Sequence, residues 1–191
     1  MRRLLVLSAV VMSMGVFALA ESNSLNEDSR IDIFGGYSHV GNYGIGLNGW
    51  IVSGTWDISR IIGVEGDISG GYGSNNLGGA ANVLPNVPNS IGSRMHNFNF
   101  GPIGTYRAES GKYDAFGHLL FGFSHTNVNA ADVGEGDTAF SWILGAGADY
   151  NFNSTWAARA QLDWLHTNFF NDGQNHGRIS LGLVYRIGGE D

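Results

Sequence analysis

The stretch Arg178–Ile187, RISLGLVYRI, alternates between two kinds of side chain. One parity carries Ile179, Leu181, Leu183, Tyr185 and Ile187, whereas the other carries Arg178, Ser180 and Arg186. Side chains of a β-strand point alternately to opposite faces, so this period of two predicts a strand with one apolar and one polar face. Its length also suits the roughly 9–11 residues that a tilted strand needs to cross a membrane.

Seven further segments show the same alternation: Ile31–Val40, Trp50–Ile58, Val64–Tyr72, His96–Tyr106, Ala115–Thr126, Thr138–Tyr150 and Thr155–His166. Long, Gly- and Asn-rich connections are expected at Val40–Gly49, Gly73–Met95, Asn127–Asp137 and Thr167–Gly177, and short ones at Ser59–Gly63, Arg107–Asp114 and Asn151–Ser154. Alternating long and short connections are typical of outer-membrane barrels, whose long loops lie outside the cell. The sequence therefore predicts an all-β fold, an eight-stranded antiparallel up-and-down transmembrane β-barrel.

The first residues of the chain have the pattern of a cleaved export signal. Arg2 and Arg3 give a positive start, Leu4–Leu19 is apolar, and Ala18-Leu19-Ala20 matches a small-x-small cleavage site. The apolar run is shorter than a comfortable membrane-spanning helix of about 20 residues. We predict a signal peptide over 1–20, a flexible segment over 21–29 and the barrel domain over 30–191.

Lysine usage and aromatic placement favour a membrane barrel over a soluble one. After the predicted cleavage Lys112 is the only lysine, although a solvated exterior normally uses lysine freely. Aromatic residues gather near the strand ends, where the two membrane interfaces would lie. These predicted interface aromatics are Trp50, Tyr72, Tyr106, Tyr150, Trp156, Trp164 and Tyr185. The apolar faces are therefore expected to meet lipid and the polar faces the lumen.

The polar parity predicts a network of charged and amide side chains inside the barrel. Its members are Asp32, Asp57, Glu65, Asp67, Arg107, His118, Asp149, Arg159, Gln161, Asp163, Arg178 and Arg186, in which six carboxylates face four arginines. A barrel of about eight strands has an interior just wide enough for side chains to fill it, and buried charges persist only when paired. We expect a structural salt-bridge network that plugs the lumen. A small ion-conducting pore is the alternative.

His118 raises a second alternative, a lipid-modifying enzyme. A histidine base with a carboxylate such as Glu65 and a serine such as Ser69 or Ser124 could form a nucleophilic site. No convergent nucleophile and base can be identified from the sequence, and function has to be argued from an assembled site. We therefore expect no enzyme activity and interpret His118 as a residue of the packed polar lumen.

Composition and charge limit the possible partners. The net charge is −7, and loss of Arg2 and Arg3 would make it −9, which argues against nucleic acid because phosphate binding needs a basic footprint. The chain has no cysteine, which excludes disulfides and thiolate metal sites. We expect no cofactor and no bound metal, and a monomer.

Four histidines gather at the loop ends of the predicted strands: His39, His96, His125 and His166. All four share the parity of the residues expected to face lipid. They can be interpreted as amphipathic residues of the interface. A sharper hypothesis is contact with lipopolysaccharide phosphates, strengthened by protonation at mildly acidic pH.

Several segments carry a resemblance: Phe34-Gly35-Gly36-Tyr37-Ser38, Leu47-Asn48-Gly49-Trp50, Phe98-Asn99-Phe100-Gly101-Pro102, Ala115-Phe116-Gly117-His118, Asp137-Thr138-Ala139-Phe140 and Arg159-Ala160-Gln161-Leu162-Asp163. They resemble the outer-membrane β-barrel domain family, which includes the OmpA and OmpX transmembrane barrels. The resemblance covers Ile31–Gly188. It implies a non-catalytic outer-membrane protein with a membrane-integrity or surface-interaction role, mobile extracellular loops, and contact with outer-membrane lipids including lipopolysaccharide.

The last strand also resembles the signal read by the barrel-assembly machinery during biogenesis. Ser180, Gly182, Tyr185 and Ile187 fit its pattern of a polar residue, a glycine and two spaced hydrophobic residues. The family usually ends on an aromatic residue, whereas here Gly188–Asp191 follows Ile187.

Overall fold

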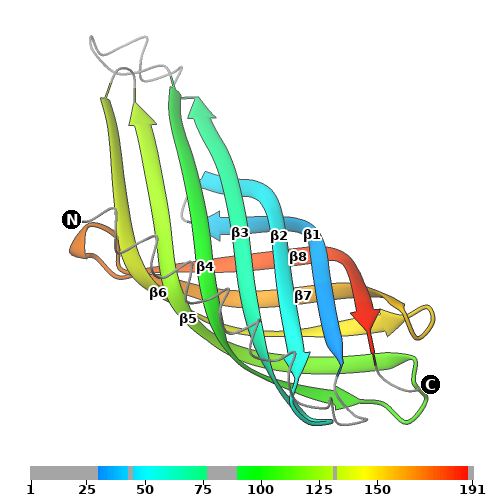
Figure 1. Ribbon diagram of the computed structural model, residues 1–191. Coiled ribbons are helices and arrows are strands. Elements are labelled where there is room, and N and C mark those ends of the chain that lie inside the picture. The colour runs from blue at the N-terminus through cyan, green and yellow to red at the C-terminus, as the bar shows by residue number, and fades with distance from the viewer. Residues whose placement is uncertain (1–29, 43–44, 77–89, 131–132, 189–191) are drawn as a thin grey trace.

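The computed structural model describes residues 30–42, 45–76, 90–130 and 133–188. The strands are β1 (Ile31–Asn42), β2 (Ile45–Asp57), β3 (Ile62–Asn76), β4 (Ser90–Arg107), β5 (Tyr113–Ala130), β6 (Val133–Asn151), β7 (Trp156–Thr167) and β8 (Gln174–Ile187). Each pairs antiparallel with the next, and β8 pairs with β1 to close the barrel (Figure 1). The predicted fold is confirmed. The predicted signal peptide and the segment 21–29 lie outside the described residues.

We call the end of the barrel that holds Ile31, Ile187 and the three short turns the turn end, and the opposite end the loop end. A short 3₁₀ turn, η2 (Phe169–Asn171), joins β7 to β8 at the loop end. No helix in the described ranges is long and apolar enough to cross a membrane.

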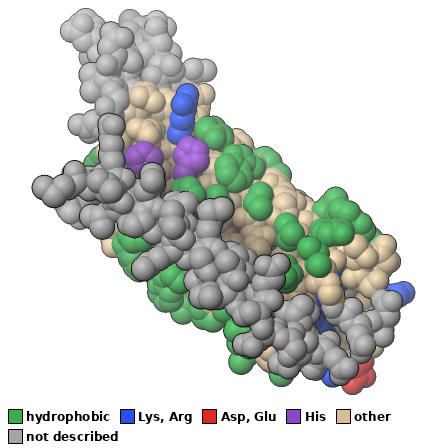
Figure 2. All heavy atoms as spheres, viewed as in Figure 1, with side chains coloured by type: hydrophobic (Ala, Val, Ile, Leu, Met, Phe, Trp, Pro, Cys, Tyr) green, Lys and Arg blue, Asp and Glu red, His purple; other side chains and the backbone are tan. Residues whose placement is uncertain are grey.

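The outward face of the wall is apolar from the turn end to well past its middle. In β4 the outward residues are Tyr106, Gly104, Pro102, Phe100 and Phe98, and Phe100 is 68% exposed. Figure 2 shows hydrophobic side chains over the middle of the molecule. An exposed apolar band of this kind is what a lipid-facing wall requires.

The outward apolar series ends at a polar residue in most strands. These residues are His39, Asn48, His96, His125, Thr138, His166 and Asn175, all on the outward parity. Each lies roughly ten residues from the turn end, and such a length of tilted strand spans an apolar band about 25 Å tall. We call this level the outer boundary of the apolar band.

Strands β3–β6 continue beyond this boundary as a protruding sheet. β4 and β5 stay paired up to Ile91 and Ala130, and β5 and β6 up to Ala130 and Val133. The β2–β3 ladder stops at Asn48 and Tyr72, and the β6–β7 ladder stops at Ser141 and Thr167. In Figure 1 these four strands extend past the others.

The protruding sheet corrects the predicted connections. Residues 127–130 and 133–137 are paired strand rather than a loop, and the predicted loop Val40–Gly49 is largely the paired ends of β1 and β2. The predicted connection Gly73–Met95 is strand at both of its ends, over 73–76 and 90–95, and its middle lies outside the described residues. The predicted loop Thr167–Gly177 is shortened to η2 and its flanks by the start of β8 at Gln174.

Candidate functional site

The polar side chains predicted to face the lumen do face it. All of the twelve are buried except Arg107, which is half-buried near the turn end. Two charged residues that the sequence analysis missed join them, Arg30 and Asp114. Asp114 shares the parity of His118 on β5, so alternation could have identified it had the strand been extended to Tyr113. These charges form two separate groups along the barrel.

The first group, the turn-end ion cluster, contains Arg30, Arg107, Arg159 and Arg186 with Asp32, Asp57, Asp114 and Asp149. Arg159 holds Asp149 with a two-pronged contact, Nε to Oδ1 at 2.8 Å and Nη2 to Oδ2 at 2.9 Å. Its guanidinium also lies 4.3 Å from the centre of the Phe116 ring. Four arginines match four aspartates, so the cluster is neutral when all are ionised.

The turn-end ion cluster is redundant, because every aspartate has two arginines within ion-pair distance. Asp32 and Asp114 each contact Arg30 and Arg186, Asp57 contacts Arg30 and Arg107, and Asp149 contacts Arg159 and Arg186. Loss of one arginine therefore leaves each aspartate with at least one cation nearby.

The second group, the mid-barrel ion cluster, contains Arg178, His118, Glu65, Asp67 and Asp163. Arg178 Nη2 lies 2.7 Å from Asp67 Oδ2, and Arg178 Nε lies 2.7 Å from Asp163 Oδ2. Its Nη1 also donates to Ser69 Oγ at 3.0 Å. The Arg178 side chain is fully buried, so its planar donors replace water for two carboxylates from opposite parts of the wall.

His118 joins the other side of this cluster. Its Nδ1 lies 2.7 Å from Glu65 Oε2 and its Nε2 lies 3.0 Å from Asp163 Oδ1. Ionised carboxylates only accept hydrogen bonds, and the imidazolium form of His118 has an N–H to donate to each of the two. Gly145 makes room for the pair, because a Cβ there would collide with both Asp163 Oδ1 and His118 Nε2.

Apolar side chains complete the filling of the lumen, and the sequence analysis did not predict them. Towards the loop end they are Val40, Leu47, Met95, Leu120, Ala139, Ile143, Leu165 and Phe169. A second group is Phe34, Ile51, Ala157 and Val184. Leu120, Ile143 and Leu165 are completely buried. In the described strands, the lumen is thus packed with side chains above and around the ionic groups.

The contacts of the two candidate serines test the enzyme hypothesis. Ser69 Oγ accepts from Arg178 and from Asn97, and Ser124 Oγ donates to Asn97 Oδ1 at 2.6 Å. Both ring nitrogens of His118 already face carboxylates. Among the described residues, neither serine forms a hydrogen bond with His118, so the proposed nucleophile and base are not brought together.

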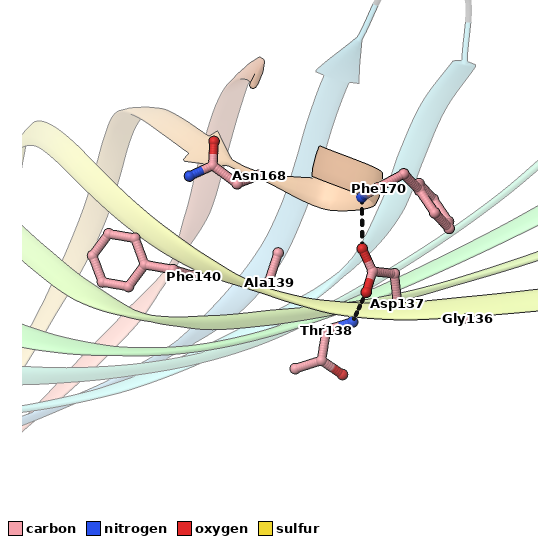
Figure 3. A pocket seen from close by; sticks show the side chains of 7 residues that line it. All are labelled: Gly136, Asp137, Thr138, Ala139, Phe140, Asn168 and Phe170. Carbon is pink, nitrogen blue, oxygen red and sulfur yellow. Dashed lines mark hydrogen bonds between the residues drawn. The ribbon is translucent and has the colours of Figure 1, made fainter. Parts of the chain in front are cut away.

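A shallow pocket lies on the protruding sheet beside η2, lined by Gly136, Asp137, Thr138, Ala139, Phe140, Asn168 and Phe170. Figure 3 shows the Asp137 side chain between Thr138 of β6 and Phe170 of η2. Asp137 Oδ2 accepts from the Phe170 N–H at 2.6 Å, and Oδ1 accepts from the Thr138 N–H at 2.8 Å. This carboxylate therefore fixes η2 against the edge of β6.

The seven predicted interface aromatics all point outward, with exposed fractions from 40% at Trp50 to 71% at Tyr106. Trp156 and Tyr185 pack against each other near the turn end, with ring centres 5.0 Å apart. Of the predicted assembly signal, Tyr185 and Ile187 face outward and Ser180 faces the lumen, while Gly182 lies opposite Gly36 of β1. Recognition of these residues by an assembly machine stays a prediction.

Comparison with known proteins bears on the whole barrel. Ail, the attachment invasion locus protein of Yersinia pestis, has a TM-score of 0.55 at 16% identity over 84% of this chain and 98% of that one. That structure holds the heparin analogue sucrose octasulfate. Neisserial surface protein A is also similar, with a TM-score of 0.60 at 9% identity over 87% of this chain and 99% of that one. OprG from Pseudomonas aeruginosa has a TM-score of 0.55 at 11% identity over 85% of this chain and 97% of that one.

Identities this low show a common fold and nothing finer. A search of the curated proteins found no relative. The model of the outer membrane protein beta-barrel domain, in contrast, matches residues 5–186. This match spans nearly all of the described barrel, and the chain therefore belongs to the outer membrane protein beta-barrel domain family.

Proposed function

We propose that this chain is a non-catalytic protein of the bacterial outer membrane that acts at the cell surface through its protruding sheet. The observation that carries this proposal is the continuation of β3–β6 beyond the outer boundary of the apolar band. Paired strands beyond the band add surface outside the membrane rather than wall within it. The shallow pocket beside η2 adds a shaped surface on the same side.

The filled lumen supports a role other than transport. Ionic clusters and apolar groups occupy the space that a conducting path would need. The arrangement around His118 supports a non-catalytic role, because carboxylates occupy both ring nitrogens and the nearby serines bond elsewhere. The enzyme and pore alternatives therefore have no specific observation in their favour.

We further propose export by a signal peptide over 1–20, delivery by the barrel-assembly machinery, and a monomer surrounded by outer-membrane lipids. The family, whose members are outer-membrane barrels, supports this location. Fractionation with outer membranes and a mature N-terminus at Glu21 are the expected results. Recovery as a soluble periplasmic monomer would contradict the proposal.

A shortened barrel tests the surface role. In the variant, Val128–Glu135 and residues 74–92 are each replaced by a tight turn, which removes the outer parts of β3–β6 and leaves the band below intact. Intact cells that display either form are applied to arrays of extracellular-matrix proteins and glycans. Both forms should show heat-modifiable gel mobility, and only the full-length form should bind.

The contrary outcome is equally clear. A deletion strain can be complemented with either form and its permeability to large antibiotics measured. If both forms restore the barrier equally, and full-length and shortened forms bind the arrays alike, the role is structural and the surface proposal fails.

A further inference from the structure

The distribution of charge differs completely between the two faces of the wall. Every strand carboxylate whose side chain the structure describes lies on the inward parity, although the chain carries a net charge of −7. Among the described strand residues, Arg94 is the charged side chain of the outward face, and it stands beside histidines. On the face that Figure 2 shows, a basic side chain stands next to two histidines above the hydrophobic band, and the visible acidic side chain lies at the opposite end.

These residues form a compact outward patch, which we define as Tyr72, Arg94, His96, His125 and Asn127. His96 and His125 are direct cross-strand neighbours, and Arg94 is paired with Asn127 on one side and Tyr72 on the other. The Tyr72 hydroxyl lies 3.3 Å from His96 Nε2. Arg94 and Asn127 are exposed and both histidines are half-buried, so a ligand can reach the patch from outside the wall.

The level of the patch determines what it meets. His96 and His125 mark the outer boundary of the apolar band on β4 and β5, directly beyond the outward residues Phe98 and Phe123. At this depth a membrane presents its headgroups. Phosphate oxygens are strong acceptors for guanidinium and imidazolium donors, and no carboxylate on the described outward face competes for them.

We propose that the outward patch binds a phosphate group on the headgroup of an outer-leaflet lipid. Arg94 supplies a permanent charge and a planar pair of donors, and the two histidines add charge when protonated. This inference goes beyond the surface role of the protruding sheet, because it concerns a lipid ligand at the base of that sheet, where it meets the apolar band, and it rests on the barrel's place in the outer membrane.

The hydrogen bonds of His125 are compatible with both protonation states. Its Nδ1 lies 2.7 Å from Thr138 Oγ1, and its Nε2 lies 2.8 Å from Asn127 Nδ2. In the neutral ring, His125 Nε2 accepts a hydrogen bond from the Asn127 amide nitrogen. In the protonated ring, Nε2–H donates either to the Asn127 amide oxygen, once the amide has flipped, or to a phosphate oxygen that replaces it. The titratable or charged groups facing the two histidines from β3 and β4 are Tyr72 and Arg94, and β6 contributes the uncharged Thr138.

Native mass spectrometry of the purified barrel with defined lipids tests the proposal. The probes are diphosphorylated lipid A, its fully dephosphorylated form and inorganic phosphate, each at about pH 5.5 and about pH 8, on either side of the usual titration of histidine. The variants are Arg94→Gln and the double variant His96→Gln/His125→Gln. The matched control is His39→Gln, which alters a histidine at the same level on β1 with Asn48 rather than an arginine beside it. Heat-modifiable mobility reports whether each variant is folded.

We expect wild type to bind the diphosphorylated probe about tenfold more tightly at the lower pH, the factor carried by one charge-assisted hydrogen bond. Arg94→Gln should weaken binding about tenfold at both pH values. The double histidine variant should lose the tighter binding at the lower pH, because the phosphate itself gains negative charge towards the higher pH. His39→Gln should behave as wild type. Equal binding of the dephosphorylated probe, or unchanged binding in folded Arg94→Gln, would overturn the site. Equally tight binding of inorganic phosphate would overturn the lipid as its source.

Discussion

The two ion clusters in the lumen are built from the same residue types but differ in how their charges are shared. In the turn-end ion cluster four aspartates each have two arginines nearby. In the mid-barrel ion cluster Asp67 depends on Arg178 alone, Glu65 depends on His118 alone, and only Asp163 contacts both cations. We call the first arrangement redundant, because each carboxylate has two cations, and the second single-partner, because two of its three carboxylates have one.

The difference follows from distance to water. Arg30 and Arg107 of the turn-end cluster keep 15% and 26% of their side chains exposed, so solvent still screens part of the charge. The side chains of Arg178, Asp67, His118 and Glu65 are fully buried. In a dry interior a charge left without its partner is costly, so sensitivity to substitution should depend on the number of partners and on depth rather than on residue type.

The largest effect is expected for Arg178→Gln. Removal of this guanidinium leaves Asp67 without a cation and Asp163 with His118 only. Breaking a buried pair in this way costs about 3–5 kcal/mol. Urea unfolding of the barrel in phosphatidylcholine vesicles, followed by gel mobility, measures the loss. Arg178→Lys keeps the charge without the planar donors, so its stability should lie between those of Arg178→Gln and wild type. A loss of stability for Arg178→Gln below that of Arg186→Gln would contradict the single-partner interpretation.

A smaller loss is expected for the same substitution in the turn-end cluster. Arg186→Gln removes contacts with Asp32, Asp114 and Asp149, yet Arg30 or Arg159 remains beside each of these aspartates. The loss should be about 1.5–3 kcal/mol, the range for hydrogen bonds to charged groups. The measurement is the same unfolding series. Equal losses of stability for the two arginine variants would remove the distinction between the redundant and the single-partner cluster.

Gly145→Ala tests how tightly the mid-barrel cluster is packed. The added methyl group would collide with the His118–Asp163 contact, and overpacking of this kind costs about 1–3 kcal/mol. Gly54→Ala is the control, because a Cβ on this β2 glycine meets nothing within 4 Å. A stability loss shared by both variants would trace the effect to the backbone of a strand glycine rather than to the ion cluster.

Conductance should change least of all. Because apolar groups lie above and around the ionic clusters, neither wild type nor Arg186→Gln should open a path through the lumen. Planar-bilayer recordings of both proteins are therefore expected to stay at the baseline. Large, steady currents from wild type would reject the filled lumen and favour the pore.

Alternation in the sequence was sufficient to predict the strand number, their order and the facing of the charged residues. It succeeded where one face is apolar and the other polar, as at Arg159–Asp163 of β7. It failed in the protruding sheet, because neither face there is consistently apolar: Asn127 and Asn129 alternate with Thr126 and Val128 without a clear contrast.

The apolar filling of the lumen was missed for the opposite reason. Around Leu119, Leu120 and Phe121 both faces of β5 are apolar, so periodicity cannot show that Leu120 points inward. Nor could the sequence show which arginine serves which aspartate. Arg178 and Asp67 are far apart in the chain and meet only because the barrel closes.

The barrel is closed at one seam, the pairing of β1 with β8. Seven of the eight strand pairings join sequence neighbours through a hairpin, whereas β1 and β8 bring together opposite ends of the chain. At this seam Gly36 lies opposite Gly182, and a Cβ on either would collide with the backbone of the other strand. Local hairpins form with little loss of chain entropy, so the search of the two terminal strands for each other should set the rate of folding. The rate of barrel closure then depends on the pairing of β1 with β8, in which Gly36 and Gly182 let the two backbones approach closely.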